Sequence, residues 1–272
     1  MATTENQNQA VTIGVMLTAF RRTQWLGEQL HAVLDQTVRP SDILIWDQSE
    51  NGVGSEFARH AIRVPKNMGV WPRFTVSQYL NTDYIAVFDD DTIPGRRWLE
   101  NCLRCFSQLG PCLLGGNGVS FADGDREKRA YVGWSQPCEN IVEADIVGHS
   151  WVFPRSLLDG WEASEFAACT TYGEDYYIAY QAQRRGWKTY VPPHPPADKS
   201  WWSSVRGELG EDGNALYLQP GEPENKARFH KCLMDKGWKP SAVIKDDQGN
   251  YGMQMIALAE HAQRCPHCGG AL

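Results

Sequence analysis

Hydrophobic positions in the first part of the chain follow two alternating patterns. Short runs of aliphatic and aromatic residues are typical of buried strands, and they cover residues 11–17, 43–46, 61–64 and 84–88. Between them, apolar residues recur at helical spacing, as at Leu26, Leu30 and Leu34. The helices predicted in this way cover residues 23–35, 73–80 and 97–109. Strands that alternate with helices predict an α/β fold with a mostly parallel sheet flanked by helices.

Polar residues directly follow several of these strand-like runs. Thr18 to Arg22 follow the first run, Asp47 to Ser49 follow the second, and Asp89 to Asp91 follow the run at 84–88. In an open parallel sheet, ligands bind beyond the carboxyl ends of the strands. Three adjacent carboxylates repel one another and lose solvation, so a cation is expected beside them. Mg²⁺ or Mn²⁺ suits such hard oxygen ligands and can hold a diphosphate, whereas the simpler interpretation is a solvated acidic turn.

The regular alternation breaks after Leu109. Short strands are expected near residues 112–119, 130–134 and 141–147, and a last one at 189–191. Glu174 and Asp175 precede a strongly patterned helix at 176–185, where two acids at the N-terminus are favoured by the helix dipole. Asp175 is therefore either an ordinary acid of a helix N-terminus or a functional carboxylate.

Composition places the chain among ordinary globular proteins. It has 272 residues, of which 42% are hydrophobic and 22% charged. No apolar run approaches the ~18 residues that a membrane span needs. Residues 1–10 are polar, without the cationic flank and apolar centre of a signal peptide, so we expect a loose tail and a cytoplasmic protein. The net charge of −7 makes a nucleic-acid backbone possible but not favoured as the main partner.

The eight cysteines of such a chain are expected to be thiols or metal ligands rather than disulfides. Cys102 and Cys105 lie at core positions of a predicted amphipathic helix, so packing explains them. Cys265 and Cys268 flank a turn that is followed by glycines, which is typical of a zinc knuckle. Structural Zn²⁺ would need two further ligands, from His261 or from His230 with Cys232. The competing interpretation is a reduced, unstructured tail.

The order of these motifs resembles a known family. The motifs that carry this resemblance are, in order, a strand followed by TAFRR, a strand followed by DQS, then KNMG, a strand followed by FDDD, and GED before a helix. With them, the chain is similar to the inverting glycosyltransferases of the GT-A fold, family 2-like. The resemblance spans residues 11–196, about two thirds of the chain. It implies a Rossmann-like catalytic domain at 11–197. Residues 198–272 would then form a small helical appendage carrying the cysteine knuckle, with helices expected at 225–237 and 251–264.

The resemblance also implies roles for particular residues. The donor-binding residues would be Thr18, Ala19, Phe20, Arg21, Asp47 (reading the base edge), Asn67, Arg73, Asp89 and Asp90. Asp89 and Asp91 would be the Asp-x-Asp pair that holds the metal, with His194 as a further ligand and His149 as its rival. Asp175 would be the general base, and Glu174 would orient the acceptor. The family carries a second Asn or a small residue where Trp71 to Arg73 stand here, so Arg73 is free to contact phosphate instead.

For function, the resemblance implies a hexosyl- or pentosyltransferase. It would use Mn²⁺ or Mg²⁺ to move a sugar from a nucleotide-diphosphate donor, most simply a UDP-sugar, to an acceptor hydroxyl with inversion. A carboxylate opposite the leaving diphosphate fits this chemistry. The acceptor would be a surface glycan or a lipopolysaccharide precursor. Two alternatives remain: a phage-type transferase acting on hydroxymethylated DNA bases, and a non-catalytic nucleotide- or sugar-binding protein. A nucleotidyltransferase is disfavoured because the first loop, with Arg21 and Arg22, has no glycine repeat.

Overall fold

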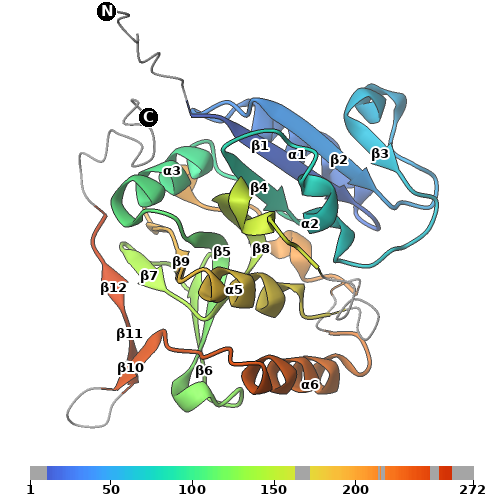
Figure 1. Ribbon diagram of the computed structural model, residues 1–272. Coiled ribbons are helices and arrows are strands. Elements are labelled where there is room, and N and C mark those ends of the chain that lie inside the picture. The colour runs from blue at the N-terminus through green and yellow to red at the C-terminus, as the bar shows by residue number, and fades with distance from the viewer. Residues whose placement is uncertain (1–10, 163–171, 214, 216–217, 246–250, 259–272) are drawn as a thin grey trace, which may run out of the picture.

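A mixed β-sheet with helices on both faces forms the centre of the molecule in the computed structural model (Figure 1). The structure describes residues 11–162, 172–213, 215, 218–245 and 251–258. Within these residues the sheet has ten strands, in the order β12-β7-β9-β5-β8-β4-β1-β2-β3, with β6 paired to β5. The strands are β1 (Ile13–Ala19), β2 (Asp42–Asp47), β3 (Ala61–Arg63), β4 (Tyr84–Phe88), β5 (Leu113–Phe121), β6 (Arg129–Gly133), β7 (Ile141–Glu143), β8 (Ile146–Pro154), β9 (Thr189–Val191) and β12 (Met255–Ile256).

The α/β fold class expected from the sequence is confirmed. Strands β3, β2, β1 and β4 run parallel to one another, as the strand–helix alternation predicts. Beyond β4 the sheet becomes mixed, because β8 runs antiparallel to both β4 and β5, while β9 is parallel to β5. This change of direction brings the middle of β8 to the carboxyl end of β4.

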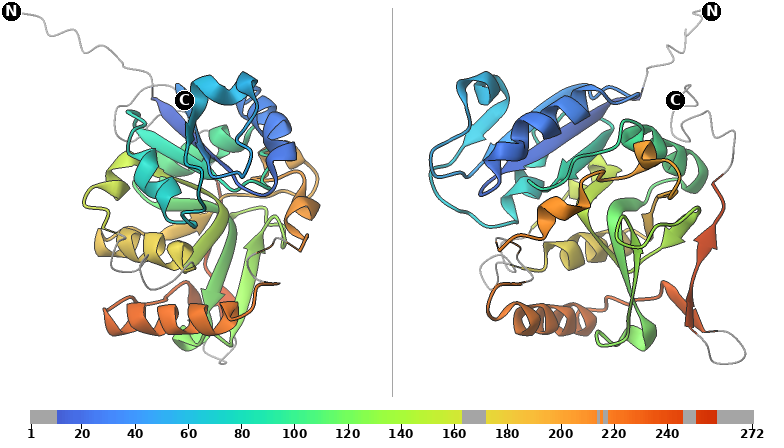
Figure 2. Two further views of the ribbon diagram at one scale, coloured as in Figure 1. Left: turned by 90° about the vertical axis from the view of Figure 1, so that its right-hand side faces the viewer. Right: turned by 180° about the vertical axis from the view of Figure 1, so that it is seen from behind.

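Two apolar cores lie on the two faces of the sheet. The helices are α1 (Leu26–Leu34), α2 (Pro72–Ser77), α3 (Trp98–Leu109), α5 (Glu174–Arg184) and α6 (Glu222–Asp235). Helices α1 and α3 bury their apolar sides in one core, where Cys102 and Cys105 are fully buried as predicted. Helices α2, α5 and α6 contribute to the other core, and α6 lies alongside α5 (Figure 2). Among the described helices, none has both the length and the apolar composition that a membrane crossing needs.

The residues after Pro196 do not follow the prediction throughout. The helix expected at 225–237 is confirmed as α6. The helix expected from Tyr251 is wrong for its first turns, which form β11 (Tyr251–Met253) and β12. Apolar residues alternate with Gly252 and Gln254 here, which is the strand period. Strand β11 pairs with β10 (Val243–Lys245), and β12 pairs with β7 of the main sheet. The predicted tail at 1–10 and the knuckle at Cys265 and Cys268 lie outside the described residues.

Candidate active site

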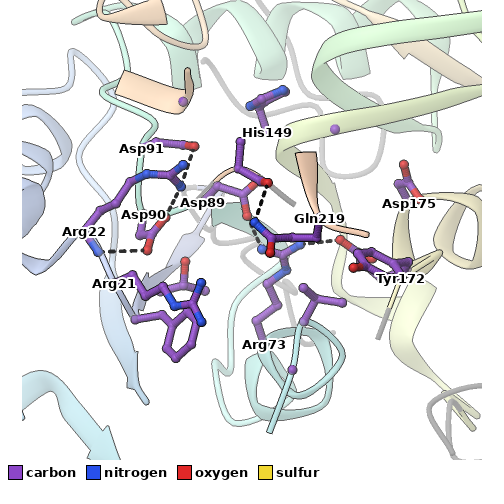
Figure 3. A pocket seen from close by; sticks show the side chains of 18 of the residues that line it. Arg21, Arg22, Arg73, Asp89, Asp90, Asp91, His149, Tyr172, Asp175 and Gln219 are labelled. Carbon is purple, nitrogen blue, oxygen red and sulfur yellow. Dashed lines mark hydrogen bonds and ion pairs between the residues drawn. The ribbon is translucent and has the colours of Figure 1, made fainter. Parts of the chain in front are cut away.

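A cavity of about 530 Å³ lies where the carboxyl ends of β1 and β4 meet the N-terminus of α5 (Figure 3). Strand register brings its walls together. Leu17 of β1 pairs with Phe88 of β4, and Phe88 pairs with Ser150 of β8. The residues just beyond these pairs therefore meet at one edge. They are Thr18, Asp89 and His149, and all three line the cavity.

Helix α1 and strand β8 fix the turn that carries the three aspartates. Gln29 of α1 donates its Nε2–H to the carbonyl oxygens of Asp89 at 2.6 Å and Thr92 at 2.8 Å. The Asp89 backbone N–H and the Thr92 hydroxyl both donate to the carbonyl oxygen of His149, at 3.1 and 2.9 Å. These bonds satisfy the turn from both sides. The acidic turn is therefore held in one conformation rather than lying free in solvent.

His149 completes a group of side chains that fits a divalent cation. One ligand atom each from Asp89, Asp91 and His149 lies within 4.8 Å of the others. The backbone of His149 has φ +64°, a left-handed conformation that costs a non-glycine residue about 1–3 kcal/mol and that accumulates at functional sites. Its ring meets the edge of Trp134, with centroids 5.0 Å apart. Two carboxylates and one imidazole form a donor set that Mn²⁺ accepts.

Two buried arginines neutralise the acidic turn. Arg22 Nη1 donates to Asp90 at 3.1 Å and to Asp91 at 3.0 Å, and its other two guanidinium nitrogens form a bidentate pair with Asp212 at 2.6 and 3.1 Å. Arg73 is bound between Asp89 and Glu174, the latter at 2.7 Å. The sequence singled out Arg22 in the first loop and Arg73 at the start of a predicted helix, but their partners depend on tertiary contacts.

Arg73 also lies over the ring of Trp151, with its guanidinium carbon 4.5 Å from the ring centroid. Its side chain is 7% exposed. The pKa of Arg73 remains raised, because the neighbouring carboxylates outweigh the cost of burial. A guanidinium so enclosed by acids and an aromatic face is a fixed positive charge in the wall of the cavity.

Burial raises the pKa of several carboxyl groups here. The pKa of Asp91 rises to about 6 because of burial and the nearby Asp89 and Asp90, with His149 and Arg22 acting in the opposite direction. The pKa of Glu174 rises to about 7, again through burial, although the charge of Arg73 opposes the rise. Raised carboxyl pKa values of this kind cluster at functional sites.

Asp175 lies at the far side of the cavity from Asp91 (Figure 3). It stands in the first turn of α5, and the backbone N–H of Tyr176 donates to its Oδ1 at 2.9 Å. Burial raises its pKa, and the ammonium group of Lys226 opposes that rise most strongly. Lys226 lines the same cavity from α6. The sequence reasoning missed this lysine, because nothing in the local pattern of α6 marks it.

Most residues singled out from the sequence do line the cavity. They are Thr18, Phe20, Arg21, Asn67, Arg73, Asp89, Asp90, Asp91, Glu174 and Asp175. Two donor-binding candidates do not. Ala19 is buried within β1. Asp47 is also fully buried, and it accepts bonds from Ser49 at 2.9 and 2.5 Å and from the backbone of Val53 at 3.0 Å. Asp47 therefore closes its own loop, and its neighbour Gln48 faces the cavity instead.

His194 is not brought to the acidic turn. It is fully buried between Trp98 and Trp202, and burial lowers its pKa to about 4. Its Nδ1 lies 2.8 Å from the Pro192 carbonyl oxygen, and its Nε2 is 2.9 Å from the Ser203 hydroxyl. Both ring nitrogens are thus engaged within the core. The structure corrects the ligand set predicted from the sequence by bringing His149, the rival candidate, to Asp89 and Asp91.

Comparisons with known proteins add little to this geometry. No family model matches the chain. No curated protein matches it either. The chain is similar to the crystal structure of S. aureus TarS, with a TM-score of 0.48 and 11% sequence identity over 67% of this chain and 35% of that chain. It thus spans about a third of the length of that protein, and a similarity at this level carries no functional argument.

Proposed function

We propose that the protein is a metal-dependent glycosyltransferase that moves a sugar from a nucleotide-diphosphate donor to an acceptor hydroxyl with inversion. One observation carries the proposal: a single cavity has a cation-compatible group on one side and a partly buried carboxylate at a helix N-terminus on the other. The first is Asp89, Asp91 and His149; the second is Asp175. The motif resemblance, read independently of the structure, supports the same arrangement.

The donor would bind along the acidic turn. Asp89, Asp91 and His149 would hold Mn²⁺ or Mg²⁺, which when bound neutralises the charge that develops on the leaving diphosphate. Arg21 also lines the cavity and would contact a phosphate oxygen. UDP is the donor nucleotide we propose, and a hexose or pentose is the sugar.

The acceptor would approach from the side of α5. Asp175 would take the proton of the attacking hydroxyl, since burial raises its basicity and the helix N-terminus faces the cavity. Glu174 is tied to Arg73 and would orient the acceptor together with it. One base and a single displacement invert the anomeric centre. The acceptor we propose is a surface glycan or lipopolysaccharide precursor, in a cytoplasmic reaction.

The first test is thermal stabilisation by a panel of nucleotide diphosphates and sugar nucleotides, with and without Mn²⁺. A ligand that binds only the folded state raises the melting temperature by mass action. We expect UDP to stabilise the protein in a Mn²⁺-dependent manner, and Asp91→Ala to abolish that dependence.

Asp175→Asn is the matched variant for catalysis. It should keep the Mn²⁺-dependent stabilisation by UDP and lose turnover of the sugar nucleotide. If no nucleotide stabilises the protein at millimolar concentration, the transferase proposal is wrong. Donor binding without any turnover by the unmodified protein would instead indicate a non-catalytic binding role.

A further inference from the structure

Helix α6 docks its inner face on the first turn of α5, where Asp175 stands. Phe229 of α6 packs so close to Gly173 that a Cβ at that glycine would lie 2.7 Å from the ring. His230 contacts the ring of Tyr176, with centroids 5.7 Å apart. Residues three and four apart share one side of a helix, so Lys226 extends this face by one turn. The side of α6 that meets α5 therefore carries a lysine towards the cavity.

Lys226 differs from an ordinary surface lysine. Its Nζ lies 2.6 Å from Oε1 of Glu222, in an i,i+4 pair whose side chains are only 26% and 7% exposed. The same helix has a second i,i+4 pair, Lys231 with Asp235, whose side chains are 75% and 63% exposed. An exposed pair contributes at most about 1 kcal/mol, whereas a charge pair in a buried setting strongly affects its neighbours. The chain thus offers a partly buried lysine and a matched exposed control on one helix.

The charged groups around Asp175 determine whether its carboxylate is ionised. The carboxylate is partly buried and has an acidic neighbour in Glu174, and both features favour its neutral form. The other charged groups that face this corner are Arg73 on α2, Glu222 on α6, and Arg126 in the loop beside Tyr176. Arg73 is already engaged by two carboxylates. Lys226 lines the same cavity as Asp175, and its ion-pair partner among the described residues is the single carboxylate of Glu222.

We propose that Lys226 is a positioning residue of this active site, which keeps the Asp175 carboxylate ionised from the opposite helix. The inference rests on the proposed function, because it gives the base its working protonation state. Glu222 in turn holds the ammonium group, so that its charge reaches Asp175 only in part. Part of the acid–base chemistry at α5 is thus supplied by the segment after Pro196.

The test titrates Asp175 directly, without needing turnover. Protein labelled with ¹³C at the aspartate carboxyl carbon is titrated by NMR with EDTA present, and the Asp175 signal is assigned by its loss in Asp175→Asn. Lys226→Met should raise the Asp175 midpoint by about one pH unit, as expected for the loss of a nearby opposite charge. Lys226→Arg should restore the original midpoint, and Lys231→Met should leave it unchanged.

A second variant keeps the inference testable if Lys226→Met does not fold. Glu222→Gln removes the carboxylate that competes for the ammonium, so the Asp175 midpoint should fall. An unchanged midpoint in Lys226→Met, or an equal shift in Lys231→Met, overturns the role of Lys226. That failure is distinct from failure of the proposed function, which is judged by whether the unmodified protein turns over a sugar nucleotide at all.

Discussion

Glu174 offers a direct test of the electrostatics of the cavity, because its neutral isostere fills the same space. The pKa of Glu174 is raised to about 7 from a usual value near 4.5. A group whose pKa is raised on folding binds its proton more tightly in the native state. Stability is therefore lost as the pH rises from the unfolded pKa to the folded one. Glu174→Gln removes this loss, so its stability relative to the unmodified protein should rise as the pH rises.

The size of the effect follows from the pKa difference. A shift of this size corresponds to about 3 kcal/mol of unfolding free energy at 1.36 kcal/mol per unit, of which about 2.5 kcal/mol develops between about pH 5 and pH 8. The side chain of Glu174 is 11% exposed, so solvent screening is small. Hydrogen-bond changes caused by the glutamine are the same at every pH. The pH dependence of the difference in unfolding free energy between the two proteins therefore reports the ionisation of Glu174.

Urea unfolding with EDTA present, at pH values from about 5 to 8, measures this difference. Glu100→Gln is the control. Hydrogen bonds with Arg97 lower the Glu100 pKa, so the stability that this carboxylate contributes is lost only below its usual pKa near 4.5, and the difference between that variant and the unmodified protein should stay nearly constant from about pH 5 to pH 8. If the unfolding free energies of Glu174→Gln and of the unmodified protein change in parallel with pH across this range, the claim that folding raises the Glu174 pKa is refuted.

Further predictions concern the supports of the site. Gln29→Leu leaves the buried Thr92 carbonyl oxygen without its donor and removes one of two donors to the Asp89 carbonyl oxygen, so it should cost about 1–3 kcal/mol in urea unfolding. Gly173→Ala should destabilise more than Gly186→Ala, since both glycines have positive φ but only the first would meet Phe229; equal losses would show that the α6 contact is unimportant. Cys265→Ser should abolish any zinc found by elemental analysis in the purified protein if the predicted knuckle is real.

Polar residues at strand ends are correctly predicted to lie at the cavity where the backbone alone decides their position. Strand register carries Thr18 and Asp89 to one edge, and an apolar run ending in polar residues marks that edge in the sequence. The same reasoning fails for Asp47, which also ends a strand. Its carboxylate finds three donors within its own loop and turns to them, and a linear pattern does not say whether such donors will be near.

The choice between the two candidate histidine ligands also depends on tertiary structure that the sequence pattern does not encode. His194 and His149 were both candidates, and the choice between them depends on the direction of β8. This strand runs antiparallel to β4, so its residue 149 meets the carboxyl end of that strand, whereas His194 is enclosed by Trp98 and Trp202. Strand direction beyond β4 is not encoded in the strand–helix alternation, which ends near Leu109. The local signal for His149 was only its turn-like surroundings, Gly148 and Ser150.

The segment after Pro196 reaches both sides of the cavity. Asp212 binds the guanidinium that also holds Asp90 and Asp91, and Lys226 faces the corner of Asp175. Removing this segment would take one of three carboxylate partners from the buried Arg22 and the neighbouring ammonium group from Asp175. The residues predicted to form an appendage are thus expected to be needed for the electrostatic balance of the site, which no motif in the first two thirds of the chain could indicate.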